Sequence, residues 1–269
     1  MTTRVVPLRR PGLWLTSAVV GALLVLLAIS IWRNPNILHP VIAQYQFAPA
    51  IMAGLRTTIV LAVLAAVIGL VLGILLAIMR LSSSPVLRLG SGAYTWLMRG
   101  TPLLVQILIW GNLALLFQHI GPFDTNAIMT PFVASVVALG LNEAAYMAEV
   151  VRAGILAVDR GQYEASLALG MPRLLSMRRI ILPQALRVII PPAGNQFISL
   201  LKATSLVSVI AGGDLLTAAQ NISSANLHTI ELMLVATFWY LMLTTITSIG
   251  QYFVERRLGR AGTGLHGAR

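Results

Sequence analysis

Long apolar stretches separated by short polar segments make up most of this 269-residue chain. A helix needs about 20 predominantly apolar residues to cross the hydrocarbon core of a bilayer. Six stretches meet this requirement, and each is predicted to be a membrane-spanning helix. They are Leu13–Trp32, Ile51–Met79, Pro102–His119, Pro131–Val151, Val188–Ala211 and Ile230–Val254.

The first stretch follows several arginines, as the apolar region of a secretory signal peptide does. Its apolar part is too long for such a region, and Ile31, Trp32 and Arg33 do not form a small-residue cleavage site. We therefore expect it to be retained as a helix.

The composition of the chain excludes a water-soluble enzyme. Hydrophobic residues make up 57% of the chain and charged residues only 10%, whereas a soluble domain carries about 25% charged residues. The predicted fold class is an all-α integral membrane protein with about six transmembrane helices. The chain has no cysteine, and its four histidines are not spaced as metal ligands, so no metal site is expected.

The charge balance is basic, with 19 Lys and Arg against 8 Asp and Glu and a formal net charge of +11. A nucleic-acid-binding protein gathers such charge on a soluble module, so no nucleic-acid partner is expected here. The arginines cluster before the first stretch, between the second and third, between the fourth and fifth, and after the sixth, whereas the opposite loops contain only Arg33. The positive-inside rule places both termini and the loop between the fourth and fifth stretches in the cytoplasm.

This loop is predicted to form a helical hairpin. Gln162–Leu169 contains Glu, Ala and Leu and no helix breaker, and Gly170 can adopt the positive φ of a helix C-terminus. Pro172 suits the first turn of a second helix, Arg173–Ile181, which Pro183 is expected to end.

Two kinds of surface suit this hairpin. Its basic side chains Arg173, Arg178 and Arg179 suit the anionic head groups of membrane lipids. Its apolar side chains, such as Leu167 and Met171, need a protein surface or the membrane interface to cover them. Composition alone leaves both possibilities open.

The other connections between the predicted spans are an elbow on the cytoplasmic side and short loops on the outer side. The Arg99–Pro102 segment is expected to be a cytoplasmic elbow in which Thr101 caps the next helix and Pro102 is its first residue. We expect this segment to serve structure rather than substrate contact. The outer loops, such as Gly121–Asn126 and Gly212–His228, are short and polar.

Several segments together resemble one family. Glu164–Ser166, then Gly170, then Ile181–Pro183 resemble the EAA loop of ABC-importer permeases. The sequences RGTPLLVQ at Arg99–Gln106 and AYMAEVVRAGI at Ala145–Ile155 resemble segments of the polar amino-acid permeases, which include histidine, glutamine, glutamate and arginine types. The chain is thus similar to the membrane subunit of a type I amino-acid importer.

The resemblance covers roughly residues 54–254 and implies the type I importer permease fold. Residues 1–50 then comprise the N-terminal segment, an extra first helix and a short outer loop. Residues 51–255 form the permease core, with the coupling loop at 152–187, and residues 256–269 form a basic cytoplasmic tail.

The resemblance also implies partners. A separate ATPase dimer binds the hairpin and carries ATP and Mg, whereas this chain has no P-loop and is expected to be a transport subunit without a cofactor. A substrate-binding protein delivers an amino acid to the outer loops, and a second permease, identical or a sister subunit, completes the assembly in a bacterial plasma membrane. The residues implied in coupling to the ATPase are Glu164, Ala165, Leu167, Gly170, Met171 and Pro183.

Glu143 is the most informative polar residue inside a predicted span, because ionisable groups are costly there and are functional candidates. Tyr146 and Met147 follow at i+3 and i+4 and share its face. Glu143 is either an internal partner for Lys202 or a contact for the ammonium or guanidinium group of an amino acid. Glu149 points largely away and is expected to pair with Arg152.

The segment Lys202–Leu206 resembles the K-[DN]-T-S-L segment of the same family, with Ala203 at the position of Asp or Asn. Lys202 offers a cation to an α-carboxylate, and Thr204 and Ser205 offer hydroxyl groups. The alternative is close helix packing, which small hydroxyl residues favour in membranes. The candidate substrate-binding residues are Glu143, Tyr146, Lys202, Thr204 and Ser205.

Three functions are therefore weighed. The favoured one is the permease of an ATP-driven importer for a polar, and by a small margin basic, amino acid. An ATP-independent proton- or ion-coupled carrier would use Glu143 and Lys202 as a relay, and a membrane scaffold would use the hairpin for docking alone. The EAA hairpin favours the importer, since neither alternative needs it for transport.

Overall fold

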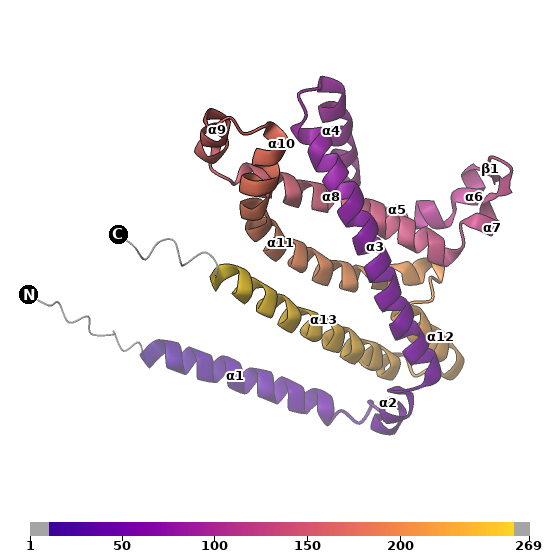
Figure 1. Cartoon of the computed structure of the whole chain (residues 1–269). Coiled ribbons are helices and arrows are strands. Elements are labelled where there is room, and N and C mark those ends of the chain that lie inside the picture. The colour runs from indigo at the N-terminus through magenta and orange to yellow at the C-terminus, as the bar shows by residue number, and fades with distance from the viewer. Residues whose placement is uncertain (1–10, 261–269) are drawn as a thin grey trace, which may run out of the picture.

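The computed structural model describes residues 11–260, which form a helical bundle with one short two-stranded ribbon (Figure 1). The predicted all-α architecture is confirmed. In chain order the elements are α1 (Pro11–Trp32), α2 (His39–Tyr45), α3 (Pro49–Leu81), α4 (Pro85–Gly100), α5 (Leu103–Gly111), α6 (Leu113–Leu116), β1 (His119–Ile120), β2 (Phe123–Asp124), α7 (Thr125–Ile128), α8 (Pro131–Leu156), α9 (Arg160–Ala168), α10 (Arg173–Ser176), η1 (Met177–Ile181), α11 (Leu182–Ala203), η2 (Thr204–Ile210), α12 (Leu215–Asn226) and α13 (Thr229–Arg260).

Helices α3 and α8 form the centre of the bundle and approach each other through small residues. A Cβ atom on Gly69 would lie 2.4 Å from Cγ of Glu143, and one on Gly73 would lie 2.7 Å from Cβ of Met147. On the α8 side, a Cβ on Gly140 would lie 2.9 Å from Ile68. Small residues allow this close approach of helices in a bilayer, where packing replaces the hydrophobic effect as the driving force.

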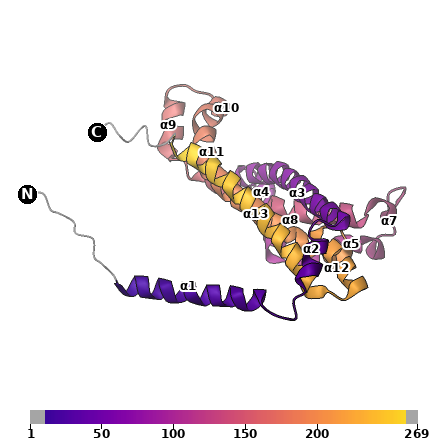
Figure 2. The ribbon, with the colours of Figure 1, turned by 90° about the horizontal axis from the view of Figure 1, so that it is seen from below.

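Among residues 11–260, three helices are individually long and apolar enough to span a membrane: α3, α8 and the Thr229–Leu258 part of α13. A fourth span can be made by the bent pair Arg173–Ile210 and Leu215–Asn226, which meet at 43°. α1 coincides with the first predicted stretch and lies apart from the other helices in both views of the ribbon (Figures 1 and 2).

The predicted third span, Pro102–His119, is not one helix. α5 ends at Gly111, and the chain continues through α6 into the β1–β2 ribbon. The segment before it contains a helix that the apolar pattern did not predict, since α4 alternates apolar residues with Arg88, Ser91 and Arg99. α4 and α5 are separated by a break at Thr101 and Pro102.

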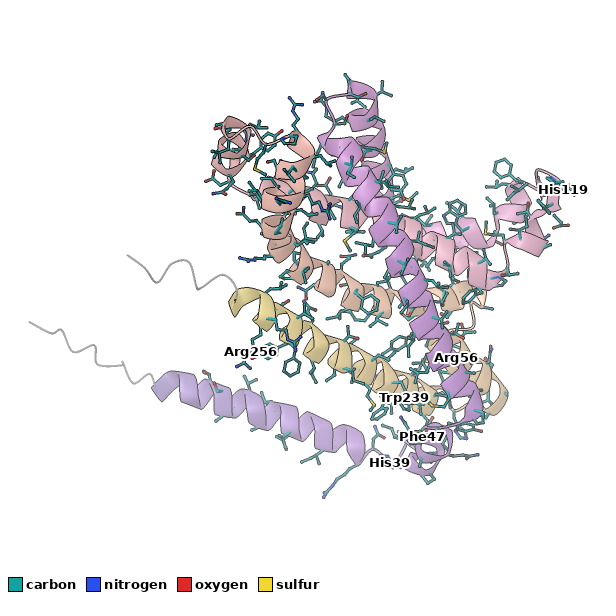
Figure 3. The ribbon with its side chains drawn as sticks, viewed as in Figure 1. His39, Phe47, Arg56, His119, Trp239 and Arg256 are labelled. Carbon is teal, nitrogen blue, oxygen red and sulfur yellow. The ribbon has the colours of Figure 1, made fainter. Side chains whose placement is uncertain are left out.

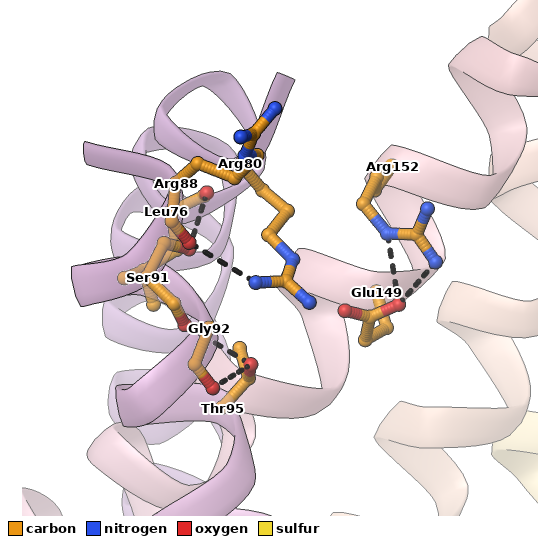
Figure 4. Close-up of polar contacts among 8 residues, drawn as sticks. All are labelled: Leu76, Arg80, Arg88, Ser91, Gly92, Thr95, Glu149 and Arg152. Atoms are coloured by element: carbon orange, nitrogen blue, oxygen red, sulfur yellow. Dashed lines mark hydrogen bonds and ion pairs between the residues drawn. The ribbon is translucent and has the colours of Figure 1, made fainter. Parts of the chain in front are cut away.

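α4 returns along the end of α3 and is fixed there by side-chain hydrogen bonds (Figure 4). Ser91 Oγ donates to the Leu76 carbonyl at 2.7 Å, and Arg80 Nη1 donates to the Arg88 carbonyl at 3.0 Å. Tyr94 Oη donates to the Leu141 carbonyl of α8 at 2.8 Å. α3 is 33 residues long, or about 50 Å at 1.5 Å per residue, so it is longer than the ~30 Å hydrocarbon core.

The predicted hairpin forms between α9 and α10, and we call this side of the molecule the hairpin end. Gly170 has a φ of +77°, as expected. The expectation that Pro183 ends the second helix is wrong, because η1 and α11 continue α10 without interruption. The π-helical turn η1 widens the helix immediately before Pro183, whose ring would otherwise clash with the carbonyl four residues earlier.

The opposite side, which we call the α12 end, is more ordered than the sequence indicates. Most of the predicted loop Gly212–His228 is the helix α12, whose first turn is capped by the buried Asp214. Asp214 accepts hydrogen bonds from backbone N–H groups of α12 and from Tyr240 Oη on α13 at 3.2 Å. The Leu215 N–H donates to Thr58 Oγ1 of α3 at 3.0 Å, so one cluster joins three helices.

Helix α2 is held on α13 at the same end. Trp239 Nε1 donates to the Gln46 carbonyl at 2.8 Å, and the Leu38 N–H donates to Glu231 Oε1 at 3.1 Å. The rings of Phe47 and Trp239 meet edge to face with centroids 5.6 Å apart (Figure 3). These contacts fix the start of α3 relative to α13.

The glycine contact between α3 and α12 gives a stability prediction. A Cβ on Gly54 would lie 2.9 Å from the Asp214 carbonyl oxygen and 3.0 Å from Leu215 Cα. Because these are backbone atoms, Gly54→Ala is expected to destabilise the protein by about 1–3 kcal/mol, the usual cost of overpacking. The readout is the midpoint temperature at which detergent-solubilised protein leaves the monodisperse peak in size-exclusion chromatography, which should fall by several degrees.

Gly90→Ala is the matched control, since Gly90 is also helical but a Cβ there meets no atom within 4 Å. Its midpoint should stay at or above that of the parent, because alanine favours helix over glycine. Equal midpoints for Gly54→Ala and the parent would refute the close contact.

Candidate functional site

A cavity of about 530 Å³ lies in the middle of the bundle, between the α4–α5 junction, α8 and α11. This volume falls within the usual range for small-molecule sites of about 300–1,000 Å³. Its lining includes carboxylate, guanidinium, amide and hydroxyl groups. The lining residues are Arg99, Gly100, Thr101, Pro102, Leu103, Asn142, Glu143, Tyr146, Gln196, Ser199, Leu200 and Ala203.

Glu143 supplies the carboxylate of this cavity. Its side chain lies against Gly69 of α3 and is 3% exposed. Gln196 Nε2 of α11 donates to Glu143 Oε2 at 3.0 Å. Within residues 11–260, no basic nitrogen lies within 4.0 Å of this carboxylate, so its hydrogen-bond partner is a neutral amide. A buried carboxylate in this condition is suited to receive a cation.

Arg99 supplies the opposite charge. Its guanidinium carbon lies 5.3 Å from the ring centroid of Tyr146, within the range of a cation–π contact. The elbow predicted at Arg99–Pro102 is present, since α4 ends at Gly100 and α5 begins at Leu103. Arg99 lies at the end of α4, where its exposed side chain lines the cavity. Glu143 and Tyr146 thus share a cavity with a cation to which sequence reasoning gave a structural role.

A network of amide side chains fixes the position of the α4–α5 junction. Asn142 Nδ2 of α8 donates to the Met98 carbonyl at 3.0 Å and to Gln106 Oε1 at 3.1 Å. Gln106 Nε2 donates to the Met98 carbonyl at 2.9 Å and to Thr101 Oγ1 at 2.8 Å. Thr101 therefore caps the end of α4 rather than the start of α5, whose N-cap is Pro102. This network holds Arg99 beside α8.

The other three candidate substrate-binding residues lie outside this cavity's lining. Lys202 is exposed at the end of α11. Thr204 is fully buried and donates to the Leu201 carbonyl at 2.7 Å, and Ser205 donates to the Lys202 carbonyl at 2.7 Å. Both hydroxyl groups are thus bonded to their own helix, and the alternative role of Glu143 as a Lys202 partner is not seen among the described residues.

A second cavity of about 520 Å³ continues from the first toward the hairpin end. Three residues, Arg99, Tyr146 and Gln196, line both cavities. The second contains Glu149, which forms the predicted ion pair with Arg152: Arg152 Nη2 lies 2.7 Å from Glu149 Oε2 (Figure 4). The remaining lining residues are Val150, Ala153, Gly154, Ala157, Val188 and Pro192.

The hairpin forms a separate surface at one end of the molecule. Of the residues implied in coupling, Glu164, Ala165, Leu167, Gly170 and Pro183 are exposed and Met171 is half-buried. Leu169 and Leu174 are also in the hairpin and are 82% and 81% exposed, respectively. Inside the hairpin, the hydroxyl groups of Ser166 and Ser176 form a buried hydrogen bond that holds α9 against α10. An apolar surface of this kind on a rigid support is typical of a docking site.

Comparison with known proteins identifies the family. Residues 69–260 match the family described as binding-protein-dependent transport system inner membrane component. The arginine transport system permease protein ArgU of Corynebacterium glutamicum is 43% identical over 96% of this chain and 83% of its own length. The L-cystine transport system permease protein TcyB of Bacillus subtilis is 40% identical over 81% of this chain and 91% of its own length.

Solved structures agree in fold. A structure of an amino acid ABC transporter with histidines has 38% sequence identity and a TM-score of 0.72, with 80% of this chain and 97% of that chain covered. The MetNI methionine ABC transporter, at 18% identity and a TM-score of 0.60 over 82% of this chain and 99% of that chain, shows the shared fold alone. The chain therefore belongs to the binding-protein-dependent inner membrane components, the permease subunits of ABC importers, which are transport components whose ATPase is a separate subunit.

Proposed function

We propose that this permease transports an amino acid with a cationic side chain, and that the cavity between Glu143 and Arg99 is its binding site. The observation that carries this proposal is the pairing of an uncompensated carboxylate with a guanidinium in one cavity. Glu143 is suited to the cationic side chain and Arg99 to the α-carboxylate, which an arginine can bind through two parallel hydrogen bonds. The 43% identity to an arginine permease supports the same substrate class.

Within this proposal Arg99 takes the role that sequence reasoning gave to Lys202. Tyr146 supports Arg99 through its ring face, and Gln196 orients the Glu143 carboxylate. Thr204 and Ser205 then have a structural role, since their hydroxyl groups donate to carbonyls of the preceding helical turn.

The two ends of the bundle suit two different partners. The hairpin end carries the exposed apolar side chains Leu167, Leu169 and Leu174, and we assign to it the ATPase dimer, which holds ATP and Mg. The α12 end presents α2, the β1–β2 ribbon and α12, and we assign to it the substrate-binding protein. A second permease, identical or a sister subunit, completes the assembly.

We also propose that the hairpin end faces the cytoplasm, with both termini on that side. Arg80 and Arg88 flank the α3–α4 turn, Arg152 lies near the end of α8, and further arginines lie in the hairpin. Arg56 lies near the other end, beside α12 (Figure 3), and Arg33 comes between α1 and α2. The positive-inside rule favours this orientation. An ion-coupled carrier using Glu143 and Lys202 is less well supported, because Glu143 bonds Gln196 and Lys202 lies outside the cavity lining.

The binding site predicts a charge-dependent loss of uptake. In proteoliposomes containing the complete importer, Glu143→Gln should lower ATP-driven uptake of L-arginine at least about tenfold, since 1.4 kcal/mol of lost interaction corresponds to a factor of ten. Arg99→Gln should lower it similarly because the α-carboxylate loses its partner. The measurement is the initial rate of radiolabelled L-arginine uptake at a concentration below saturation.

Lys202→Gln is the control, because it removes a cation of the same bundle that lies outside the cavity. Its uptake should stay within about twofold of the parent. If Lys202→Gln abolishes uptake while Arg99→Gln leaves it intact, the assignment of Arg99 as the partner of the substrate's α-carboxylate is wrong.

The hairpin surface predicts that substitutions there weaken binding of the ATPase, whereas substitutions at the α12 end do not. Leu169→Glu with Leu174→Glu should reduce the amount of ATPase that copurifies with the permease in mild detergent at least about tenfold, because charges replace apolar side chains at a buried contact. Leu227→Glu, at an 85%-exposed leucine of the α12 end, should leave copurification unchanged. Loss of the ATPase from both variants, or from neither, would contradict the assignment of the hairpin.

A further inference from the structure

The second cavity has no role in the function proposed so far, although it shares three lining residues with the first. Each cavity contains one carboxylate of α8, Glu143 in the first and Glu149 in the second. The two volumes are nearly equal, at about 530 and 520 Å³. Both volumes fall within the usual range for small-molecule sites, of about 300–1,000 Å³.

The geometry of α8 places the two carboxylates along one route. Glu143, Tyr146 and Glu149 are spaced by three residues, and positions three apart are neighbours on a helix surface. With 3.6 residues per turn, each step of three rises about 4.5 Å and turns about 60° around the axis. Glu149 thus lies about 9 Å further along α8 than Glu143 and about 120° around its axis, with Tyr146 between them.

The three residues common to both cavities form the boundary between them. Arg99 rests on the ring of Tyr146, and Gln196 approaches from α11 and is bonded to Glu143. Because the Arg99 side chain lines both cavities, an α-carboxylate bound to it is within reach of either space.

Glu149 is bonded to Arg152, and this pair is only partly buried. The side chains are 24% and 32% exposed, respectively, and both Arg152 hydrogen bonds reach the same oxygen, Oε2. Because Glu149 also lines the second cavity, an arriving cation can reach its carboxylate and take the place of Arg152. The remaining walls, Val150, Ala153, Ala157, Val188 and Pro192, suit the aliphatic part of a long side chain.

We propose that the second cavity is an inner binding station for a cationic amino-acid side chain, in which Glu149 binds the cation while Arg99 retains the α-carboxylate. This inference rests on the proposed function, since the cargo must first occupy the Glu143 cavity. The side chain then swings from Glu143 to Glu149 about its carboxylate end, and Arg152 afterwards displaces it toward the hairpin end. Each carboxylate has a cation or a hydrogen-bond donor before and after the step.

The test uses the complete importer, with radiolabelled L-arginine as cationic cargo and L-glutamine as a neutral cargo of similar length. Glu149→Gln should bind L-arginine at equilibrium within about twofold of the parent but transport it about tenfold more slowly. Glutamine uptake should change less than about twofold, because it makes no use of the carboxylate's charge. Glu149→Asp, which keeps the charge, should recover at least part of the arginine rate and confirms that the protein still folds.

Arg152→Gln separates this role from that of a structural ion pair. If the pair is only structural, Glu149→Gln and Arg152→Gln lose arginine and glutamine uptake alike, and the inner station is overturned. If Glu149 is a station, Arg152→Gln binds arginine more tightly and releases it more slowly, while glutamine uptake is maintained.

Glu143→Gln distinguishes failure of the inner station from failure of the proposed function. Loss of equilibrium arginine binding in this variant supports the first cavity whatever Glu149 does. Unchanged arginine uptake in Glu149→Gln then overturns the inner station alone. A parent importer that takes up glutamine but not arginine overturns both proposals.

Discussion

Glycines at the centre of the bundle allow α3 and α8 to pack with almost no space between their backbones, and the position of the polar site follows from that approach. Gly69 lies under the side chain of Glu143, and Gly73 lies under Met147. A larger residue at Gly69 would occupy the position of the Glu143 methylene groups. Because α3 fixes α8 in this way, it also fixes where Glu143, Tyr146 and Glu149 of α8 lie relative to α4 and α11.

The second determinant is the break between α4 and α5. A continuous helix there would place Arg99 on a regular helical surface, whereas the Thr101–Pro102 break and the amides of Gln106 and Asn142 hold the end of α4 against α8. The Met98 carbonyl, left free where the helix stops, is used by both amides. The site is therefore assembled from irregular backbone that lines a cavity, one of the situations in which such backbone is tolerated at membrane depth.

The sequence predicts well those features that depend on local chemistry. Three of the long apolar helices, the left-handed Gly170 and the Glu149–Arg152 pair follow from composition or spacing, and the structure confirms them. It does not predict α4, because this helix buries only Ser91 and Thr95 and is held on α3 by polar side chains, so it has no continuous apolar run. The cavity itself depends on tertiary contact, because Arg99 and Gln196 are distant in sequence from Glu143. The available signal in the sequence was the RGTP segment at Arg99–Pro102 followed by the polar Gln106, whose side chain bonds this junction.

The uninterrupted course of α10, η1 and α11 has a consequence for the coupling of the two ends. One helical rod joins Arg173 in the hairpin to Gln196, the residue that donates to Glu143, over roughly 35 Å at 1.5 Å per residue. The loop expected at Pro183 would have absorbed a displacement of the hairpin, but a continuous helix transmits it. Movement imposed on the hairpin is thereby linked to the amide that contacts the buried carboxylate, through a helix in which Pro191 and Pro192 lie just before Gln196.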